Sequence, residues 1–70
     1  MSMYAGRCLL GDYLGSRGWS QRYLARLSGV PTSTVSDYIR NDSLMSLNHA
    51  KNIANVLGCN IDDLYEWVSD

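Results

Sequence analysis

The stretch "LARLSGVPTSTVSDYIRND", from Leu24 to Asp42, decides the fold because it places a sharp break between two apolar patterns. The apolar residues on either side of the break are Leu24, Ala25 and Leu27 before it, and Val35, Tyr38 and Ile39 after it. Both sets have helical spacing. Within the break, Gly29 can adopt a positive φ, and the fixed φ of Pro31 suits the first turn of a helix. The stretch therefore predicts two helices joined by a tight turn.

The spacing of Leu24, Ala25, Gly29 and Val35 is typical of a helix-turn-helix, in which two helices cross steeply over a short turn. Ala25 must be small because the next helix crosses over it, and Val35 must be apolar because it faces back toward Ala25. The pattern predicts that the second of these helices carries a polar outer face.

That outer face contains short polar side chains, namely Thr32, Ser33, Ser36 and Asp37, with Arg40 one turn further on. A helix of this width fits the major groove of B-DNA, where hydroxyl groups exchange hydrogen bonds with base edges and a carboxylate accepts from a cytosine amino group. The same residue types are also common at exposed helix starts that bind nothing. The pattern alone leaves both interpretations open.

Three further helices are expected from spacing and end signals. Leu9, Leu10, Tyr13 and Leu14 predict a first helix over residues 4 to 16, which Gly18 ends before Ser20 caps the next helix. Ser46 is expected to cap a fourth helix that ends at Gly58 and buries the following residues: Leu47, Ala50, Ile53, Ala54 and Leu57.

Asn60 and Asp63 have the spacing of a capping box, which predicts a short fifth helix. It would bear Ile61, Leu64, Tyr65, Trp67 and Val68. No strand pattern, repeat or linker is evident. We therefore expect residues 1–70 to form one all-α domain of five short helices.

Composition narrows the possible functions. The 70 residues are 46% hydrophobic and 19% charged, as in a soluble globular domain, and no apolar run is long enough to cross a membrane. With one histidine and no CxxC pair, the chain offers no zinc-ligand set, so no metal and no cofactor are expected. His49 and Cys8 have no third group to orient them, which argues against an enzyme. We expect a cytoplasmic protein with buried, reduced cysteines.

The net charge of −1 conceals an uneven distribution. Residues 1–40 hold five arginines against two aspartates, whereas residues 41–70 hold one lysine against five acidic residues. Such asymmetry suggests a basic face with an acidic back.

From Gly18 to Ile39, "GWSQRYLARLSGVPTSTVSDYI" resembles the Cro/repressor class of helix-turn-helix regulators, also called the XRE family. The later segment "AKNIANVLGCNIDDLYEW", Ala50 to Trp67, resembles the ending of the same family, so the similarity covers most of the chain after residue 8. The resemblance implies a compact, five-helix, lambda-repressor-like domain that binds double-stranded DNA in the major groove.

Carried over to this sequence, the resemblance implies that Thr32, Ser33, Ser36 and Asp37 contact bases. It implies that the following residues contact phosphates: Ser20, Gln21, Arg40, Asn41 and Asn48. Arg22 and Arg26 remain open between a phosphate contact and a plain surface role.

Two departures from the family are visible. Leu14 replaces an arginine that many members carry late in the first helix, and "IRNDS" after the recognition helix lacks the usual cations. Two hypotheses therefore stand: a regulator, typically a repressor, that binds a palindromic operator as a homodimer, and a protein-interaction module that retains the fold. Tyr65 and Trp67 on the expected C-terminal helix are the candidate pairing residues of the homodimer.

Overall fold

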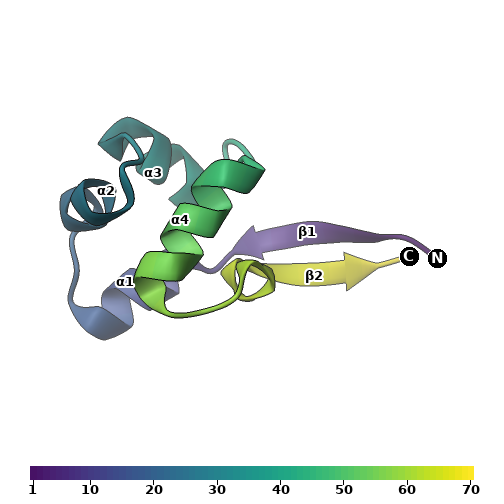
Figure 1. The fold of residues 1–70 in the computed structure, drawn as a ribbon. Coiled ribbons are helices and arrows are strands. Elements are labelled where there is room, and N and C mark those ends of the chain that lie inside the picture. The colour runs from purple at the N-terminus through teal and green to yellow at the C-terminus, as the bar shows by residue number, and fades with distance from the viewer.

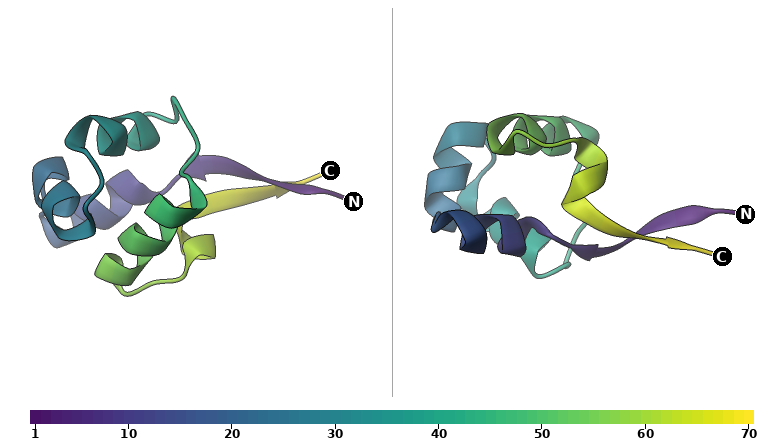
Figure 2. Two further views of the ribbon diagram at one scale, coloured as in Figure 1. Left: turned by 45° about the horizontal axis from the view of Figure 1, so that its top comes forward. Right: turned by 90° about the horizontal axis from the view of Figure 1, so that it is seen from below.

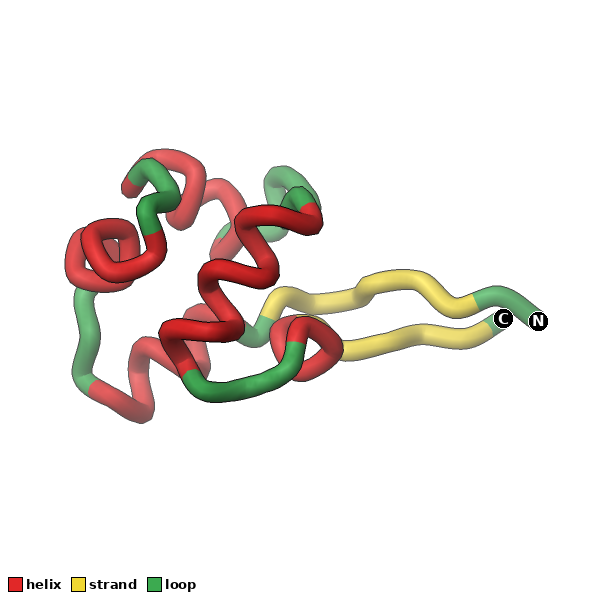
Figure 3. Tube along the Cα trace, in the orientation of Figure 1, coloured by secondary structure: helices red, strands yellow, loops and turns green.

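A computed structural model covers residues 1–70 and shows a helical body from which a two-stranded ribbon projects (Figure 1). The helices are α1 (Leu10–Arg17), α2 (Gln21–Ser28), α3 (Thr32–Ile39) and α4 (Leu47–Leu57), followed by the 3-10 helix η1 (Ile61–Leu64). The strands are β1 (Met3–Cys8) and β2 (Tyr65–Ser69). Both chain termini lie at the far end of the ribbon (Figure 3).

The helix ends follow the capping signals in the sequence. The Ser20 side chain accepts a hydrogen bond from the Tyr23 N–H, and the Ser46 side chain accepts one from the His49 N–H. Gly18, Gly29 and Gly58 all adopt left-handed conformations directly after a helix, a conformation that is strained for residues with a Cβ. The predicted caps at Ser20 and Ser46 and the predicted stops at Gly18, Gly29 and Gly58 are therefore confirmed.

The expectation of an all-α, five-helix domain is wrong at both ends of the chain. Residues 3 to 8 form a strand, so the first helix begins at Leu10 rather than at residue 4. The capping box at Asn60 and Asp63 is present, but it starts only the four residues of η1. Tyr65 and Trp67 then lie on β2 and not on a helix.

The ribbon is antiparallel, with Met3 opposite Ser69 and Ala5 opposite Trp67. The register shifts between Ala5 and Cys8, and a Cβ built on Gly6 would come within 3.1 Å of the Glu66 carbonyl oxygen. A side chain at position 6 would therefore crowd the backbone of β2.

One core of 14 buried residues joins the helices to the base of the ribbon. It includes Leu10, Leu24, Val35, Ile53 and Leu64, and from the ribbon it includes Cys8 and Tyr65. Burial raises the pKa of Cys8 and of Tyr65. Leu47 was expected in the core but is 73% exposed, and Leu27 on α2 is also exposed.

Both cysteines are free. Cys8 is buried as expected, whereas Cys59 is only half-buried. No helix in the chain is long and apolar enough to cross a membrane.

Candidate nucleic-acid interface

The elbow formed by α2, Gly29 to Pro31, and α3 is held together by backbone geometry and by one hydroxyl group. The Gly29 N–H donates to the Ala25 carbonyl at 2.9 Å, with Gly29 at φ 74°. The Ser28 hydroxyl donates to the Leu24 carbonyl and accepts from the Val30 N–H. Because the N–H groups of Gly29 and Val30 are both paired, the turn holds one conformation and sets where α3 begins.

The two helices of the elbow pack through small and branched apolar residues. Ala25 and Val35 are both buried in the core, and Val30 in the turn is 1% exposed. Figure 2 shows α2 and α3 crossing at the end of the body that lies away from the ribbon. The inner face of α3 is thus fully used, and only its polar outer face is free.

Four residues predicted to contact bases lie along that outer face. Thr32 and Ser33 are exposed, and their side chains make no hydrogen bond within the chain. Ser36 and Asp37 are partly exposed, and both bond to Arg40. The first turn of α3 therefore presents unpaired hydroxyl groups, while the second half is tied to a guanidinium group.

Arg40 is the centre of a small polar network rather than a free cation. Its Nη1 donates to the Ser36 hydroxyl at 2.6 Å, its Nη2 donates to Asp37 at 2.7 Å, and its Nε donates to Asp42 at 2.9 Å. All three guanidinium nitrogens therefore have a partner within the chain. The charge of Arg40 is offset by two carboxylates.

Asn41, predicted to contact phosphate, is turned toward the ribbon. It has a positive φ of 60°, its side-chain oxygen accepts from the Cys8 N–H at 2.8 Å, and its side-chain nitrogen donates to the Gly6 carbonyl at 3.1 Å. Asparagine tolerates the left-handed conformation better than most residues. Asn41 therefore fastens the end of α3 to β1.

The remaining phosphate candidates lie at helix starts. Ser20 caps α2, Gln21 is its first residue and is partly buried, and Asn48 is exposed in the first turn of α4. No hydrogen bond joins any of them to α3. Helix starts favour anions because their N–H groups are unpaired.

Two comparisons with known proteins bear on this arrangement. A family model described as Helix-turn-helix matches residues 10–64, which include all four α-helices and η1. The chain belongs to the Cro/repressor class of helix-turn-helix proteins. The predicted family resemblance is thus confirmed.

A curated relative supports the same assignment for this helix-turn-helix protein. The "SPbeta prophage-derived uncharacterized HTH-type transcriptional regulator YopS" of Bacillus subtilis (strain 168) is 35% identical over 63 residues. The match covers 89% of this chain and 85% of the relative. Membership of this class makes the protein a DNA-binding regulator and not an enzyme, as the sequence predicted.

A contact that the sequence did not reveal links the recognition helix of this helix-turn-helix protein to α4. The Tyr38 hydroxyl lies 2.8 Å from Nδ1 of the half-buried His49. Residues 38 and 49 belong to different elements, so no local spacing announces the pair. The contact fixes the end of α3 against the first turn of α4.

Charge is arranged along the long axis of the molecule. Arg22 and Arg26 lie on α2, which contains no acidic residue, whereas Asp62, Asp63 and Glu66 lie on η1 and β2. Figures 1 and 2 show α2 and the ribbon at opposite ends. Within the helix-turn-helix the unopposed positive charge therefore lies on α2, since Asp37 and Asp42 offset the charge of Arg40. No cluster of three or more His, Cys, Asp or Glu side chains is arranged to hold a metal.

Proposed function

We propose that this protein is a transcriptional repressor that binds a roughly palindromic operator as a homodimer, with α3 in the major groove. The observation that carries the proposal is the first turn of α3, where Thr32 and Ser33 are exposed and unpaired on a helix fixed by a buried elbow. Such hydroxyl groups can donate to or accept from base edges, and the threonine methyl can contact a thymine methyl.

In the proposed complex, Thr32, Ser33, Ser36 and Asp37 contact bases. Asp37 accepts from a cytosine amino group while Arg40 keeps the carboxylate oriented, at a distance of 2.7 Å. Ser20, Gln21 and Asn48 contact phosphates from the starts of α2 and α4. Phosphate contacts set the register, and the α3 contacts set the sequence.

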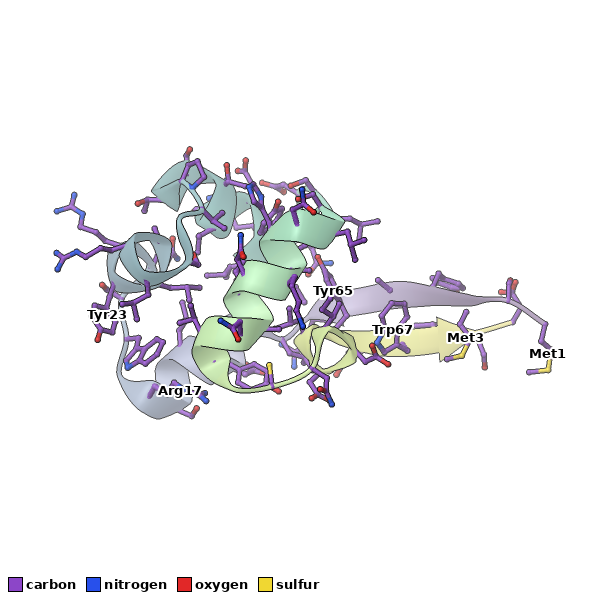
Figure 4. All side chains as sticks on the ribbon, in the orientation of Figure 1. Met1, Met3, Arg17, Tyr23, Tyr65 and Trp67 are labelled. Carbon is purple, nitrogen blue, oxygen red and sulfur yellow. The ribbon has the colours of Figure 1, made fainter.

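An apolar groove supports the homodimer. It lies between the ribbon and the start of α4 and is lined only by hydrophobic residues: Tyr4, Ala5, Leu44, Met45, Leu47, Ala50, Ile61, Tyr65 and Trp67. Both labelled aromatic residues of β2 line it: Trp67 is 47% exposed, whereas Tyr65 is buried (Figure 4). Groups of exposed apolar residues of this kind mark protein interfaces.

Two-fold pairing suits the small size of the recognition surface. One eight-residue helix contacts few base pairs, whereas a dimer places two helices about 34 Å apart, one turn of B-DNA. Because the named relative is described as prophage-derived, control of a prophage or other mobile element is the setting we propose.

The proposal is tested by selecting bound sequences from a random duplex pool and then measuring affinity for the selected site across a salt series. We expect an inverted-repeat site and a log Kd that rises steeply with log salt concentration, because bound phosphates release counterions. Absence of binding at low salt, or a slope near zero, would overturn the repressor assignment.

A second candidate is a protein-interaction module that retains the fold. The observation that favours it is the neutralised Arg40, since the chain lacks free cations directly after α3. In that case duplex DNA would not bind, and the groove containing Trp67 would serve a different protein. The same salt series separates the two candidates.

A further inference from the structure

We propose that Arg22 and Arg26 form a phosphate-binding ridge on the outer face of α2. In this proposal the ridge, rather than Arg40, makes the main charged contacts with the phosphates of the DNA backbone. The inference rests on the proposed DNA-binding function and adds residues to it. The sequence left Arg22 and Arg26 undecided and favoured Arg40.

Of the chain's six cations, Lys51 is exposed and unpaired on α4, and the other five are arginines, three of which are engaged within the chain. Arg7 is paired with Asp12 and Glu66, and Arg40 with Asp37 and Asp42. Arg17 donates to the Leu57 carbonyl at 2.8 Å and lies over the Tyr13 ring. Arg22 and Arg26 are exposed and have no ion pair or hydrogen bond within the chain. They are the arginines whose guanidinium groups remain available to a ligand.

Arg22 and Arg26 also lie close to each other on α2. Arg22 and Arg26 are four residues apart on one helix, so their side chains leave the same face about 5 to 6 Å apart at the Cβ atoms. Like charges at this spacing repel, and α2 contains no acidic residue that offsets the repulsion. A bound anion would remove the repulsion, and guanidinium groups bind phosphate oxygens in a bidentate manner.

The two arginines line a shallow, open depression on the surface of the elbow. Its other lining residues are Ala25 of α2, Gly29, Val30 and Pro31 of the turn, and Thr32 at the start of α3. Thr32 is also the first residue of α3 that is free to contact bases. A phosphate held at the ridge therefore lies next to the base pair that Thr32 reaches, which is the arrangement that a backbone following the major groove requires.

The distribution of acidic residues selects the ligand. The ribbon, with Glu66 on β2, lies at the end of the molecule opposite α2, and α2 itself contains no acidic residue, so the negatively charged DNA backbone meets little repulsion at the α2 end (Figures 1 and 2). Arg40, in contrast, has carboxylates on two sides at 2.7 and 2.9 Å. A phosphate at Arg40 would have to approach both of them.

The test compares the full-length variants Arg22→Gln, Arg26→Gln and the double variant in the salt series on the selected duplex. Glutamine keeps a helix propensity close to that of arginine, so α2 should remain folded. We expect each single substitution to weaken binding on the order of tenfold at about 0.1 M salt and to reduce the log-log slope by about 0.9. The base preference at the selected site should stay unchanged.

Arg7→Gln is the matched control, because it removes one positive charge from β1, outside the helix-turn-helix. It should leave the slope of log Kd against log salt concentration unchanged. The double variant with Arg22→Lys and Arg26→Lys keeps both positive charges and should leave this slope unchanged as well. If the wild-type slope is steep but the double glutamine variant keeps it, the ridge is wrong and the proposed function stands. If the wild-type protein does not bind duplex DNA at low salt, the proposed function is wrong, and so is the proposed role of the ridge.

Discussion

The elbow of α2 and α3 and the ribbon of β1 and β2 are built in opposite ways. The elbow joins neighbouring residues, buries Leu24, Ala25 and Val35, and exposes hydroxyl groups and arginines together with Tyr23 and Leu27. The ribbon joins the two ends of the chain, with Met3 opposite Ser69, and it exposes Met3, Tyr4, Trp67 and Val68. A surface rich in hydroxyls and cations suits DNA, whereas a surface of large apolar side chains suits another protein chain.

The strongest test of this contrast is Leu24→Ala, which leaves a cavity where the elbow meets the rest of the core. Leu24 is 0% exposed, and removing a fully buried leucine costs about 3 to 4 kcal/mol. In a domain of this size that is a large share of the total stability. We expect a cooperative unfolding transition at much lower denaturant concentration, measured by circular dichroism.

Leu44→Ala is the matched control for this substitution. Leu44 lines the apolar groove but is 67% exposed, so in the monomeric protein its truncation should change the free energy of unfolding by less than about 0.5 kcal/mol. If the two variants lost similar stability, the elbow would not be the centre of the fold.

The elbow was predictable because its signals are local. Gly29 needs a positive φ, Ser20 caps the helix that follows it, and Ala25 and Val35 occupy fixed distances along the chain. Each of these requirements involves residues a few positions apart, so the sequence displays them directly. The same local logic correctly predicted that Thr32 and Ser33 would be exposed.

The ribbon escaped prediction because its partners are distant in sequence. Ile61, Leu64, Tyr65 and Val68 follow helical spacing, yet the aromatic and β-branched residues after Leu64 pair with β1 instead. An antiparallel pair between the chain ends produces no local pattern, and Gly6 looked like a weak helix residue rather than a close contact. The pairing of β2 with β1, and not the local helical spacing, therefore determines the secondary structure after Leu64.

Part of the recognition site escaped prediction for the same reason. The sequence does not show that Arg40 bonds to Ser36, Asp37 and Asp42, or that Asn41 bonds to Gly6 and Cys8. The family resemblance assigns a role to a residue from its position along the sequence. Whether its side chain is free to bind DNA depends instead on the residues that surround it in the fold. Only the structure separates the paired Arg40 from the unpaired Arg22 and Arg26.

Asn41 joins the two regions, so Asn41→Ala should loosen the ribbon from α3. The change removes the acceptor of the Cys8 N–H and the donor to the Gly6 carbonyl, and it replaces asparagine at φ 60° with a residue that tolerates the left-handed conformation less well. We expect a loss of about 2 kcal/mol in the free energy of unfolding. Hydrogen exchange of the β1 amide groups should accelerate more than that of the α2 amide groups.

Asn41→Gly separates the two causes. Glycine accepts the positive φ but makes neither hydrogen bond, so it should lose less stability than alanine while still accelerating exchange in β1. The slope of log Kd for DNA against log salt concentration, measured for Asn41→Gly, also tests the predicted phosphate contact of Asn41. An unchanged slope would mean that Asn41 acts within the fold alone.

Trp67→Ala tests the ribbon as a pairing surface. The side chain is 47% exposed at the rim of the apolar groove, and its Nε1 donates to the Asp62 carbonyl. If the proposed homodimer uses this groove, the dimer Kd should rise by about 30-fold, as for an aromatic hot spot of about 2 kcal/mol. Analytical ultracentrifugation over a concentration series measures this constant.

Leu27→Ala is the control in the elbow region, because Leu27 is 44% exposed on α2. It should leave the dimer Kd unchanged. A dimer weakened equally by both substitutions would place the interface on α2 and would contradict the assignment of pairing to the ribbon.

Asp42→Asn should produce the smallest effect and the sharpest contrast between the two regions. Asp42 forms an exposed ion pair with Arg40, so its loss should alter the free energy of unfolding by less than about 0.5 kcal/mol. Removing a carboxylate beside α3 should nevertheless tighten DNA binding by about two- to fivefold at low salt. Glu66→Gln removes the same charge from the ribbon and should leave affinity unchanged. A protein that binds DNA through α2 and α3 must respond more strongly to the loss of the nearer carboxylate, Asp42. Equal gains in affinity for the two variants would mean that only the net charge of the protein matters.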